Sequence, residues 1–200
     1  MATQMKLVAS ARAKGLIFDL DGTLIDSMPL HWRAWRDVCK ELGADIEYEF
    51  FISHTGKSVE EIARILVEHY NMSCDPQQVV DGKKKMVNEH IKEVKEIKPV
   101  ADVMRMNYQK LPMTVGTGSD RRRAMVMLDN AGFTKYFAGV VSADEVTRCK
   151  PDPETFLKCA EIMGVAPEEC EVFEDGEPGL QAARAAGMIA TDVRPYYEIL

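Results

Sequence analysis

The sequence predicts an α/β protein, a doubly wound, mainly parallel sheet with a small all-α domain inserted after the first strand. Short apolar runs that end in glycine, serine or acidic residues alternate with helical stretches along most of the chain. Continuous apolar runs are typical of strands buried on both faces, as in a parallel sheet covered by helices. Helical periodicity without strands follows the first run, and 200 residues leave room for one domain carrying a sizeable insertion.

Five apolar runs predict the strands of the sheet. They are Leu16–Phe18, Met113–Val115, Val140–Val141, Val172–Phe173 and Ile189–Val193. The stretches between the later runs are helical, so the chain forms successive strand–helix–strand units. Units of this kind build an open, doubly wound sheet.

Capping residues predict three of the helices that connect these strands. Serine and aspartate cap helix N-termini, proline suits the first helical position, and glycine ends a helix. The predicted helices run from Ser119 or Asp120 to Gly132, from the cap Asp152 with Pro153 at the first helical position to Gly164, and over Pro178–Ala186 before Gly187.

Between the first and second strands, apolar residues recur at helical spacing. The series begins with Trp32 and Trp35 and continues to Val94, and no strand is predicted within it. The run Lys83–Lys85 is interpreted as the solvent-facing side of one of these helices. The predicted domains are residues 14–28 and 99–200 for the α/β core and residues 29–98 for the all-α insertion.

Charge and composition exclude several classes of function. The formal net charge is 25 − 32 = −7, which argues against nucleic-acid binding and gives no attraction to an anionic membrane. No apolar run approaches the roughly 18–20 residues of a membrane span, and the apolar stretch near Leu7 is too short for a signal peptide. Five scattered cysteines without a C-x-x-C pair indicate reduced thiols. We expect a cytoplasmic monomer.

The segment Asp19-Leu20-Asp21-Gly22-Thr23 directly follows the first predicted strand. The two aspartates are therefore expected at the carboxyl edge of the sheet, where open α/β sheets bind ligands. Three alternatives fit the segment alone: a solubilising turn, a calcium loop, or the metal-binding D-x-D of some glycosyl transferases. The calcium loop fits poorly, because an EF-hand places glycine sixth and here Gly22 is fourth.

Three further segments place polar groups at the ends of later strands. Gly116-Thr117-Gly118-Ser119 joins a strand to a helix and offers a hydroxyl and backbone N–H groups to an anion. Lys150 lies in the loop after Val140–Val141, and Glu174-Asp175 follows Val172–Phe173. Each segment alone also fits an ordinary surface turn. Together they predict a site of acids and anion-binding groups on one edge.

In this order and spacing, the motifs resemble those of the haloacid dehalogenase superfamily of phosphohydrolases. The similarity covers residues 15–195 and includes Gly179 of the last motif. Within the superfamily, the chain is most similar to the branch of β-phosphoglucomutases and small sugar-phosphate phosphatases such as fructose-1-phosphatase. The resemblance implies a Rossmann-like core and identifies the helical insertion as a four-helix cap.

The resemblance also implies roles for the motif residues. Asp19 is the expected nucleophile, which forms an aspartyl-phosphate, and Asp21 is the expected acid and base. Because oxygen ligands suit Mg²⁺, we expect this ion at the site. Its expected ligands are Asp19, Asp21 through the backbone carbonyl, Glu174 and Asp175. The groups expected to hold or polarise phosphate are Gly22, Thr23, Thr117, Gly118, Ser119 and Lys150.

In the insertion, His31 occupies the place of a histidine that couples cap closure to proton transfer in the related mutases. A structural histidine fits that position equally well. Thr55, Lys57 and Ser58 lie in the expected substrate loop of the cap and are candidates for contacts with sugar hydroxyls. The mutases place a lysine before the loop glycine and an arginine three residues after it, where this chain has Thr55 and Val59.

These observations favour a Mg²⁺-dependent phosphatase that acts on a small phosphorylated sugar or polyol. The missing arginine argues against a firm grip on a bisphosphate. The alternative is a β-phosphoglucomutase-like isomerase, which His31 supports. A third hypothesis is a catalytically silent phosphate-binding protein, although both Asp19 and Asp21 are retained.

Overall fold

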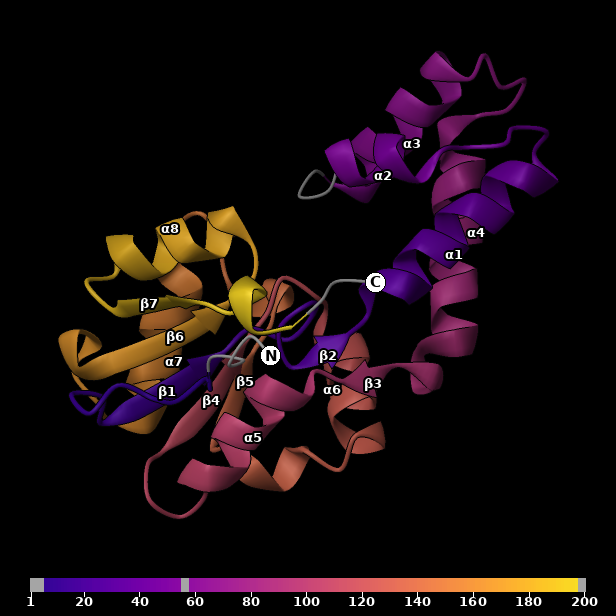
Figure 1. Cartoon of the computed structure of the whole chain (residues 1–200). Coiled ribbons are helices and arrows are strands. Elements are labelled where there is room, and N and C mark those ends of the chain that lie inside the picture. The colour runs from indigo at the N-terminus through magenta and orange to yellow at the C-terminus, as the bar shows by residue number, and fades with distance from the viewer. Residues whose placement is uncertain (1–5, 55–57, 198–200) are drawn as a thin grey trace. The chain divides into compact units, whose positions relative to one another are not determined.

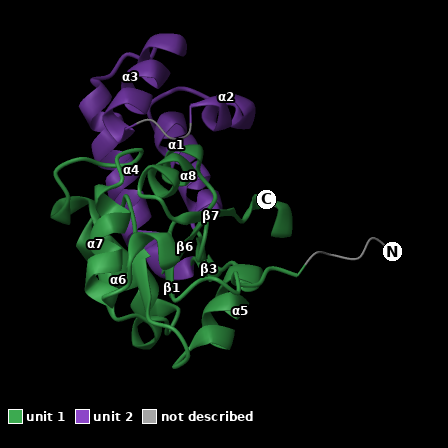
Figure 2. Ribbon diagram, turned by 90° about the vertical axis from the view of Figure 1, so that its left-hand side faces the viewer, with its two compact units in different colours: residues 1–26, 94–200 green, residues 27–93 purple. Residues whose placement is uncertain are grey.

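The computed structural model describes residues 6–54 and 58–197, which fold into two compact units. Unit 1 comprises the chain up to Asp26 and from Val94 onward, and unit 2 is Ser27–Glu93 (Figure 2). The changes between units therefore lie a few residues before the boundaries at 28/29 and 98/99 drawn from the sequence. The first boundary lies earlier because a helix of unit 2 already begins at Met28, and the second because the chain after Glu93 already forms secondary structure of unit 1.

Unit 1 contains a five-stranded sheet in the order β5-β4-β1-β6-β7, in which every pair of neighbours is parallel. Its strands are β1 (Gly15–Phe18), β4 (Met113–Gly116), β5 (Gly139–Val141), β6 (Cys170–Glu174) and β7 (Ile189–Asp192). Every residue of β1, β4 and β6 is buried, which explains the apolar runs Leu16–Phe18 and Val172–Phe173. The predicted fold class is confirmed.

Helices cover both faces of this sheet. They are α5 (Lys98–Asn107), α6 (Arg121–Asn130), α7 (Glu154–Met163) and α8 (Glu177–Ala185). α7 and α8 pack together over an apolar cluster that includes Ile17, Phe156 and Val172. Right-handed crossovers with this strand order place α5 and α6 on the opposite face. Figure 1 shows α8 and α5 on opposite sides of the sheet.

The helix boundaries follow their caps, with one correction. The Asp120 carboxylate accepts the N–H of Arg123 at 2.9 Å, so α6 begins where the sequence predicted. Pro153, however, is the N-cap of α7 and not its first helical residue. The N–H of Asp152 donates to the carbonyl of Cys149, and this turn delays the helix by one residue. α7 ends at Gly164 as expected, with φ of 65°.

A short antiparallel pair includes one strand within residues 29–98, where the sequence predicts none. β2 (Ile25–Asp26) pairs with β3 (Lys95–Glu96), with Ile25 opposite Glu96 and Asp26 opposite Lys95. Both strands belong to unit 1. Two residues are too few to show the alternation by which a strand is recognised in a sequence.

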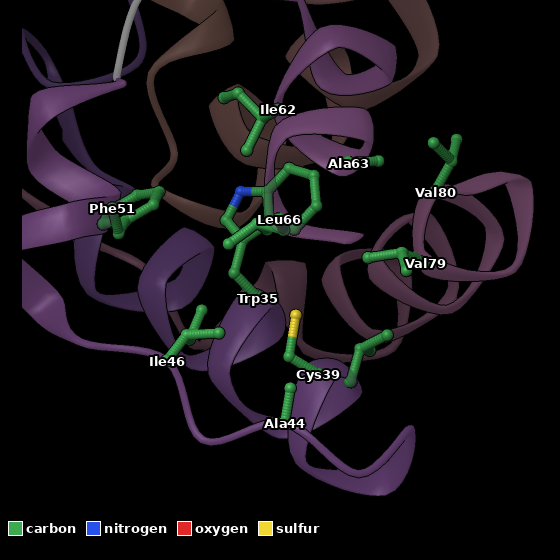
Figure 3. Close-up of a cluster of buried hydrophobic side chains, with 11 residues drawn as sticks. Trp35, Cys39, Ala44, Ile46, Phe51, Ile62, Ala63, Leu66, Val79 and Val80 are labelled. Carbon is green, nitrogen blue, oxygen red and sulfur yellow. The ribbon is translucent and has the colours of Figure 1, made fainter. Parts of the chain in front are cut away.

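Unit 2 is helical, and its described residues form four α-helices and a closing 3₁₀ turn. They are α1 (Met28–Glu41), α2 (Tyr48–Ser53), α3 (Val59–His69), α4 (Pro76–His90) and the turn Ile91–Glu93. Apolar residues from all four helices form one core, which includes Trp35 and Leu66 (Figure 3). Asp75 and Gln78 form a capping box that starts α4.

Lys83 departs from the predicted solvent-facing lysine run. Its residue surface is 5% exposed, and its ammonium nitrogen lies 5.6 Å from the centroid of the Trp35 ring. Lys85 is exposed, and Lys84 pairs with Glu60 at 3.1 Å. Position 83 is buried because α4 packs closely against α1 in this region, where Gly82 meets Val38.

Two further observations concern the cysteines and the length and polarity of the helices. All five cysteines are free thiols, and Cys39, Cys159 and Cys170 are buried. Within the described residues, every helix is too short or too polar to cross a membrane.

Candidate active site

The register of three neighbouring strands brings the sequence motifs to one edge of the sheet. Phe18, the last residue of β1, pairs with Val115 of β4 and with Phe173 of β6. Asp19 therefore follows its strand beside Glu174, and its N–H donates to the carbonyl of Phe173 at 3.0 Å. On the other side, Thr117 follows β4 and donates its N–H to the carbonyl of Val141.

Lys150 joins two of these carboxylates. Its Nζ donates to Asp19 Oδ1 at 2.6 Å and to Glu174 Oε2 at 2.7 Å. All three side chains are largely buried, and the ammonium also lies 4.7 Å from the centroid of the Phe156 ring. Although burial lowers the pKa of Lys150, the charges of Asp19 and Glu174 outweigh it and raise that pKa. Lys150 is therefore a fixed positive charge.

The two carboxylates of the last motif are held separately. Glu174 Oε1 accepts the N–H of Gly176 at 2.8 Å, while its Oε2 accepts from Lys150. Asp175 Oδ1 accepts the hydroxyl of Thr23 at 2.7 Å. The first and last motifs are thus joined by direct hydrogen bonds.

Gly22 and Thr23, for which holding phosphate stays a prediction, form a hydrogen-bonded turn next to Asp175. The N–H of Gly22 donates to the carbonyl of Ile25 at 2.8 Å, and the buried Thr23 hydroxyl is engaged by Asp175. Gly22 has φ of +82°, and a Cβ on it would lie 2.5 Å from Asp175 Oδ2. Both residues therefore shape the turn that supports Asp175.

Asp21 is held by the segment that follows β4. Ser119 Oγ donates to Asp21 Oδ2 at 2.7 Å, and the N–H of Ser119 donates to Thr117 Oγ1 at 3.0 Å. The carbonyl of Ser119 accepts the N–H of Ala143 at 3.1 Å, which fixes the segment to the end of the next strand. A Cβ on Gly118 would meet no atom within 4 Å, so the space beside this backbone is open.

The acids form a cluster with the donor set of a divalent cation site. One carboxylate oxygen each from Asp19, Glu174 and Asp175 lies within 4.8 Å of the others. Burial, followed by the charge of Glu174, raises the pKa of Asp19 to about 7. Burial and the charge of Asp19 raise the pKa of Asp175 to about 6. The positive charge of Lys150 therefore neutralises the negative charge of the acids only in part. The ligand set consists of oxygen atoms, which suits a hard divalent ion.

Gly179 provides a first test of this arrangement. A Cβ at this position would overlap the carboxylate of Glu174. We expect Gly179→Ala to displace that carboxylate from Lys150 and to lower the free energy of unfolding by about 1–3 kcal/mol, measured in urea. Replacing glycine by alanine inside a helix otherwise stabilises by up to about 1 kcal/mol. An unchanged or raised stability would therefore contradict the predicted overlap.

The predicted sugar-binding residues lie in unit 2 or outside the described structure. His31 is in the first turn of α1, where its N–H donates to the carbonyl of Ser27. Ser58 is the N-cap of α3, and its Oγ accepts the N–H of Glu61 at 3.1 Å. Thr55 and Lys57 lie outside the described residues. Contacts of these four residues with a sugar remain predictions.

Tyr197 is a further residue of the site that no sequence motif predicts. Its hydroxyl donates to the carbonyl of Gly22, next to the aspartates of the first motif. Tyr197 lies outside all four motifs and is separated from Gly22 by almost the whole chain. No local sequence signal indicates the contact, because it depends on where the segment after β7 returns in the fold.

A buried aspartate, a lysine and two further acids at the carboxyl edge of a doubly wound sheet are features of a class of hydrolases. Residues 16–193 match the family model of the haloacid dehalogenase-like hydrolases. The chain belongs to this family, and the resemblance inferred from its motifs is confirmed.

The chain is also similar to individual proteins of this family. The chain is 42% identical over 183 residues to the fructose-1-phosphate phosphatase YqaB of Escherichia coli, covering 92% of this chain and 97% of the relative. It is 30% identical over 179 residues to a phosphorylated carbohydrates phosphatase of Thermotoga maritima, covering 88% and 82%. A hydrolase structure of this family from Deinococcus radiodurans, with bound phosphate and sodium, has a TM-score of 0.77 and 26% identity, covering 90% and 80%.

Proposed function

We propose that this protein is a Mg²⁺-dependent phosphatase that removes phosphate from a small phosphorylated sugar or polyol. The observation that carries the proposal is the pair of hydrogen bonds from Lys150 to Asp19 and Glu174 within the buried acid cluster. This arrangement offers a carboxylate nucleophile beside a fixed positive charge. The two relatives named as phosphatases support a phosphorylated carbohydrate as the substrate class.

In the proposed reaction, a carboxylate oxygen of Asp19 attacks phosphorus and forms an aspartyl-phosphate. The bond between phosphorus and the sugar oxygen breaks, and Asp21 gives its proton to the departing alkoxide. In the second step, Asp21 takes a proton from a water molecule that attacks the same phosphorus, and the bond between phosphorus and the Asp19 oxygen breaks. Inorganic phosphate leaves, and Asp19 and Asp21 return to their starting states.

Other residues hold the phosphoryl group and the metal. Lys150 supplies positive charge to the phosphoryl oxygens. Thr117 Oγ1 already accepts the N–H of Ser119, so its hydroxyl proton is left to donate, and the backbone N–H of Gly118 is proposed as a further donor to the phosphoryl oxygens. When bound, Mg²⁺ would supply positive charge that offsets the repulsion of phosphate by the acids. The proposed Mg²⁺ ligands are the Asp19 and Asp175 side chains, the Asp21 carbonyl and Glu174 directly or through water.

The helical unit is proposed to select the substrate. His31 and Ser58, together with Thr55 and Lys57, are the proposed contacts to the sugar. We propose that the protein works as a cytoplasmic monomer, in keeping with its free cysteines and acidic charge.

A substrate panel tests this proposal. Purified protein is assayed with sugar and polyol phosphates, fructose 1-phosphate among them, for release of inorganic phosphate in Mg²⁺ and after chelation. We expect at least one sugar phosphate to exceed a generic aryl phosphate in kcat/KM, and activity to vanish when the metal is chelated. If no sugar phosphate exceeds the aryl phosphate, the assigned substrate class is wrong.

The same panel separates a phosphatase from a mutase. A β-phosphoglucomutase of Bacillus subtilis is 26% identical over 189 residues, so isomerase activity is the second candidate. A mutase converts glucose 1-phosphate to glucose 6-phosphate and depends on glucose 1,6-bisphosphate. We expect free phosphate and no bisphosphate dependence, because Val59 replaces the arginine expected to grip a second phosphate. Turnover that depends on Asp19 would also exclude a silent phosphate-binding protein.

A further inference from the structure

The segment after β7 returns to the acid cluster, where Val193 and Tyr197 hold it, and contacts within the segment support these two residues. The N–H of the buried Val193 donates to the carbonyl of Glu174 at 3.1 Å. Arg194 donates from Nη2 to Asp192 Oδ2 at 2.6 Å, and the N–H of Tyr196 donates to the carbonyl of Val193. These contacts fix the backbone that carries Tyr197.

Tyr197 uses this placement to hold the turn of the first motif. Its hydroxyl donates to the carbonyl of Gly22, and the next residue, Thr23, donates to Asp175. One side of the Gly22–Thr23 peptide is therefore fixed by the phenol, and the other leads directly to a carboxylate of the cluster. The N–H of Gly22 is also engaged, by Ile25.

The phenol is suited to act as a permanent donor. Burial first, then the negative charges of Asp175, Asp26 and Asp19, raise the pKa of Tyr197. The neutral hydroxyl is the form that donates a hydrogen bond to a carbonyl, and its acidic neighbours favour that form.

We propose that Tyr197 is a positioning residue of the metal site, which holds the Gly22–Thr23 peptide so that Thr23 keeps Asp175 oriented toward Asp19. The inference rests on the proposed function, because it assigns Tyr197 a task at the same site. Without the phenol hydroxyl, the turn has more freedom before metal binds, and binding has to order it.

Thermal melts over a series of Mg²⁺ concentrations, with the metal alone and no substrate, test the proposal on the full chain. The variants are Tyr197→Phe, which removes only the hydroxyl, and Tyr196→Phe as the matched control. No hydrogen bond of the Tyr196 hydroxyl is found among the described residues. We expect Tyr197→Phe to raise the Mg²⁺ concentration at half-maximal stabilisation about threefold to tenfold, and Tyr196→Phe to leave it at the wild-type value.

The metal-free melting temperature separates positioning from simple structural support. If Tyr197→Phe lowers that temperature but keeps the wild-type Mg²⁺ midpoint, the proposal is overturned. An equal rise of the midpoint in both variants would overturn it as well. If the wild-type protein shows no response to Mg²⁺, it is the proposed function that fails. The half-activating Mg²⁺ concentration in the phosphatase assay should shift with the binding midpoint for Tyr197→Phe.

Discussion

Asp19→Asn is expected to abolish turnover, with a loss of at least about 10⁴-fold in kcat, while the protein remains folded. An amide does not form an acyl phosphate under these conditions, so neither half-reaction proceeds. The fold should survive, because burial and Glu174 already raise the pKa of Asp19 and make its charge costly. Phosphate release measures turnover, and hydroxylamine trapping of an acyl phosphate measures the intermediate.

The matched control for this variant is Asp45→Asn, the same chemical change at an exposed residue of unit 2. We expect it to keep wild-type activity. Circular dichroism melts of both variants establish that they are folded. An acyl phosphate trapped from Asp19→Asn would place the nucleophile elsewhere and overturn the assignment.

Asp21→Asn is expected to lower kcat with a sugar phosphate by about 10²–10⁴-fold. Asparagine keeps an oxygen that can accept the 2.7 Å hydrogen bond from Ser119, so the geometry is retained while proton transfer is lost. With an aryl phosphate, whose leaving group needs no proton, the first step should continue. The second step should remain slow, because no base takes the proton of the attacking water.

This variant therefore gives a diagnostic accumulation of phosphoenzyme. Rapid-quench measurements with the aryl phosphate should show a burst of phenol that matches the enzyme concentration, followed by slow turnover. Asp19→Asn should show no burst. Full steady-state activity of Asp21→Asn with a sugar phosphate would refute its role as acid and base.

The fold was predictable from the sequence because its signals are local. Buried parallel strands require continuous apolar runs, and α6 and α7 end near glycines that accept the turn beyond a helix. The pair β2–β3 could not be predicted from the sequence, because strands of two residues show no periodicity. The burial of Lys83 could not be predicted either, because it depends on how closely α4 packs against α1, and a run of three lysines does not indicate this.

The candidate site was predictable where strand order converts sequence motifs into neighbours. Asp19, Lys150 and Glu174 come from three distant segments, yet the carboxyl edge of a doubly wound sheet collects them. The contacts that Gly22 and Thr23 make within the site were not predictable. Gly22 and Thr23 look like phosphate binders in the sequence, and only their partners in the folded chain show that they support Asp175.

The two-residue ladder of β2 and β3 has a consequence for how this architecture can change over evolution. Because Asp26 lies opposite Lys95, the chain re-enters unit 1 one strand spacing from where it left. Adjacent antiparallel strands can be closed by a turn of two residues, so the sheet needs nothing from the intervening segment to complete its topology. A segment of another length could therefore connect β2 and β3 without altering the strand order of the five-stranded sheet, which brings the acid cluster together. If unit 2 selects the substrate as proposed, a change of this segment would alter the substrate and leave the residues of the acid cluster in place.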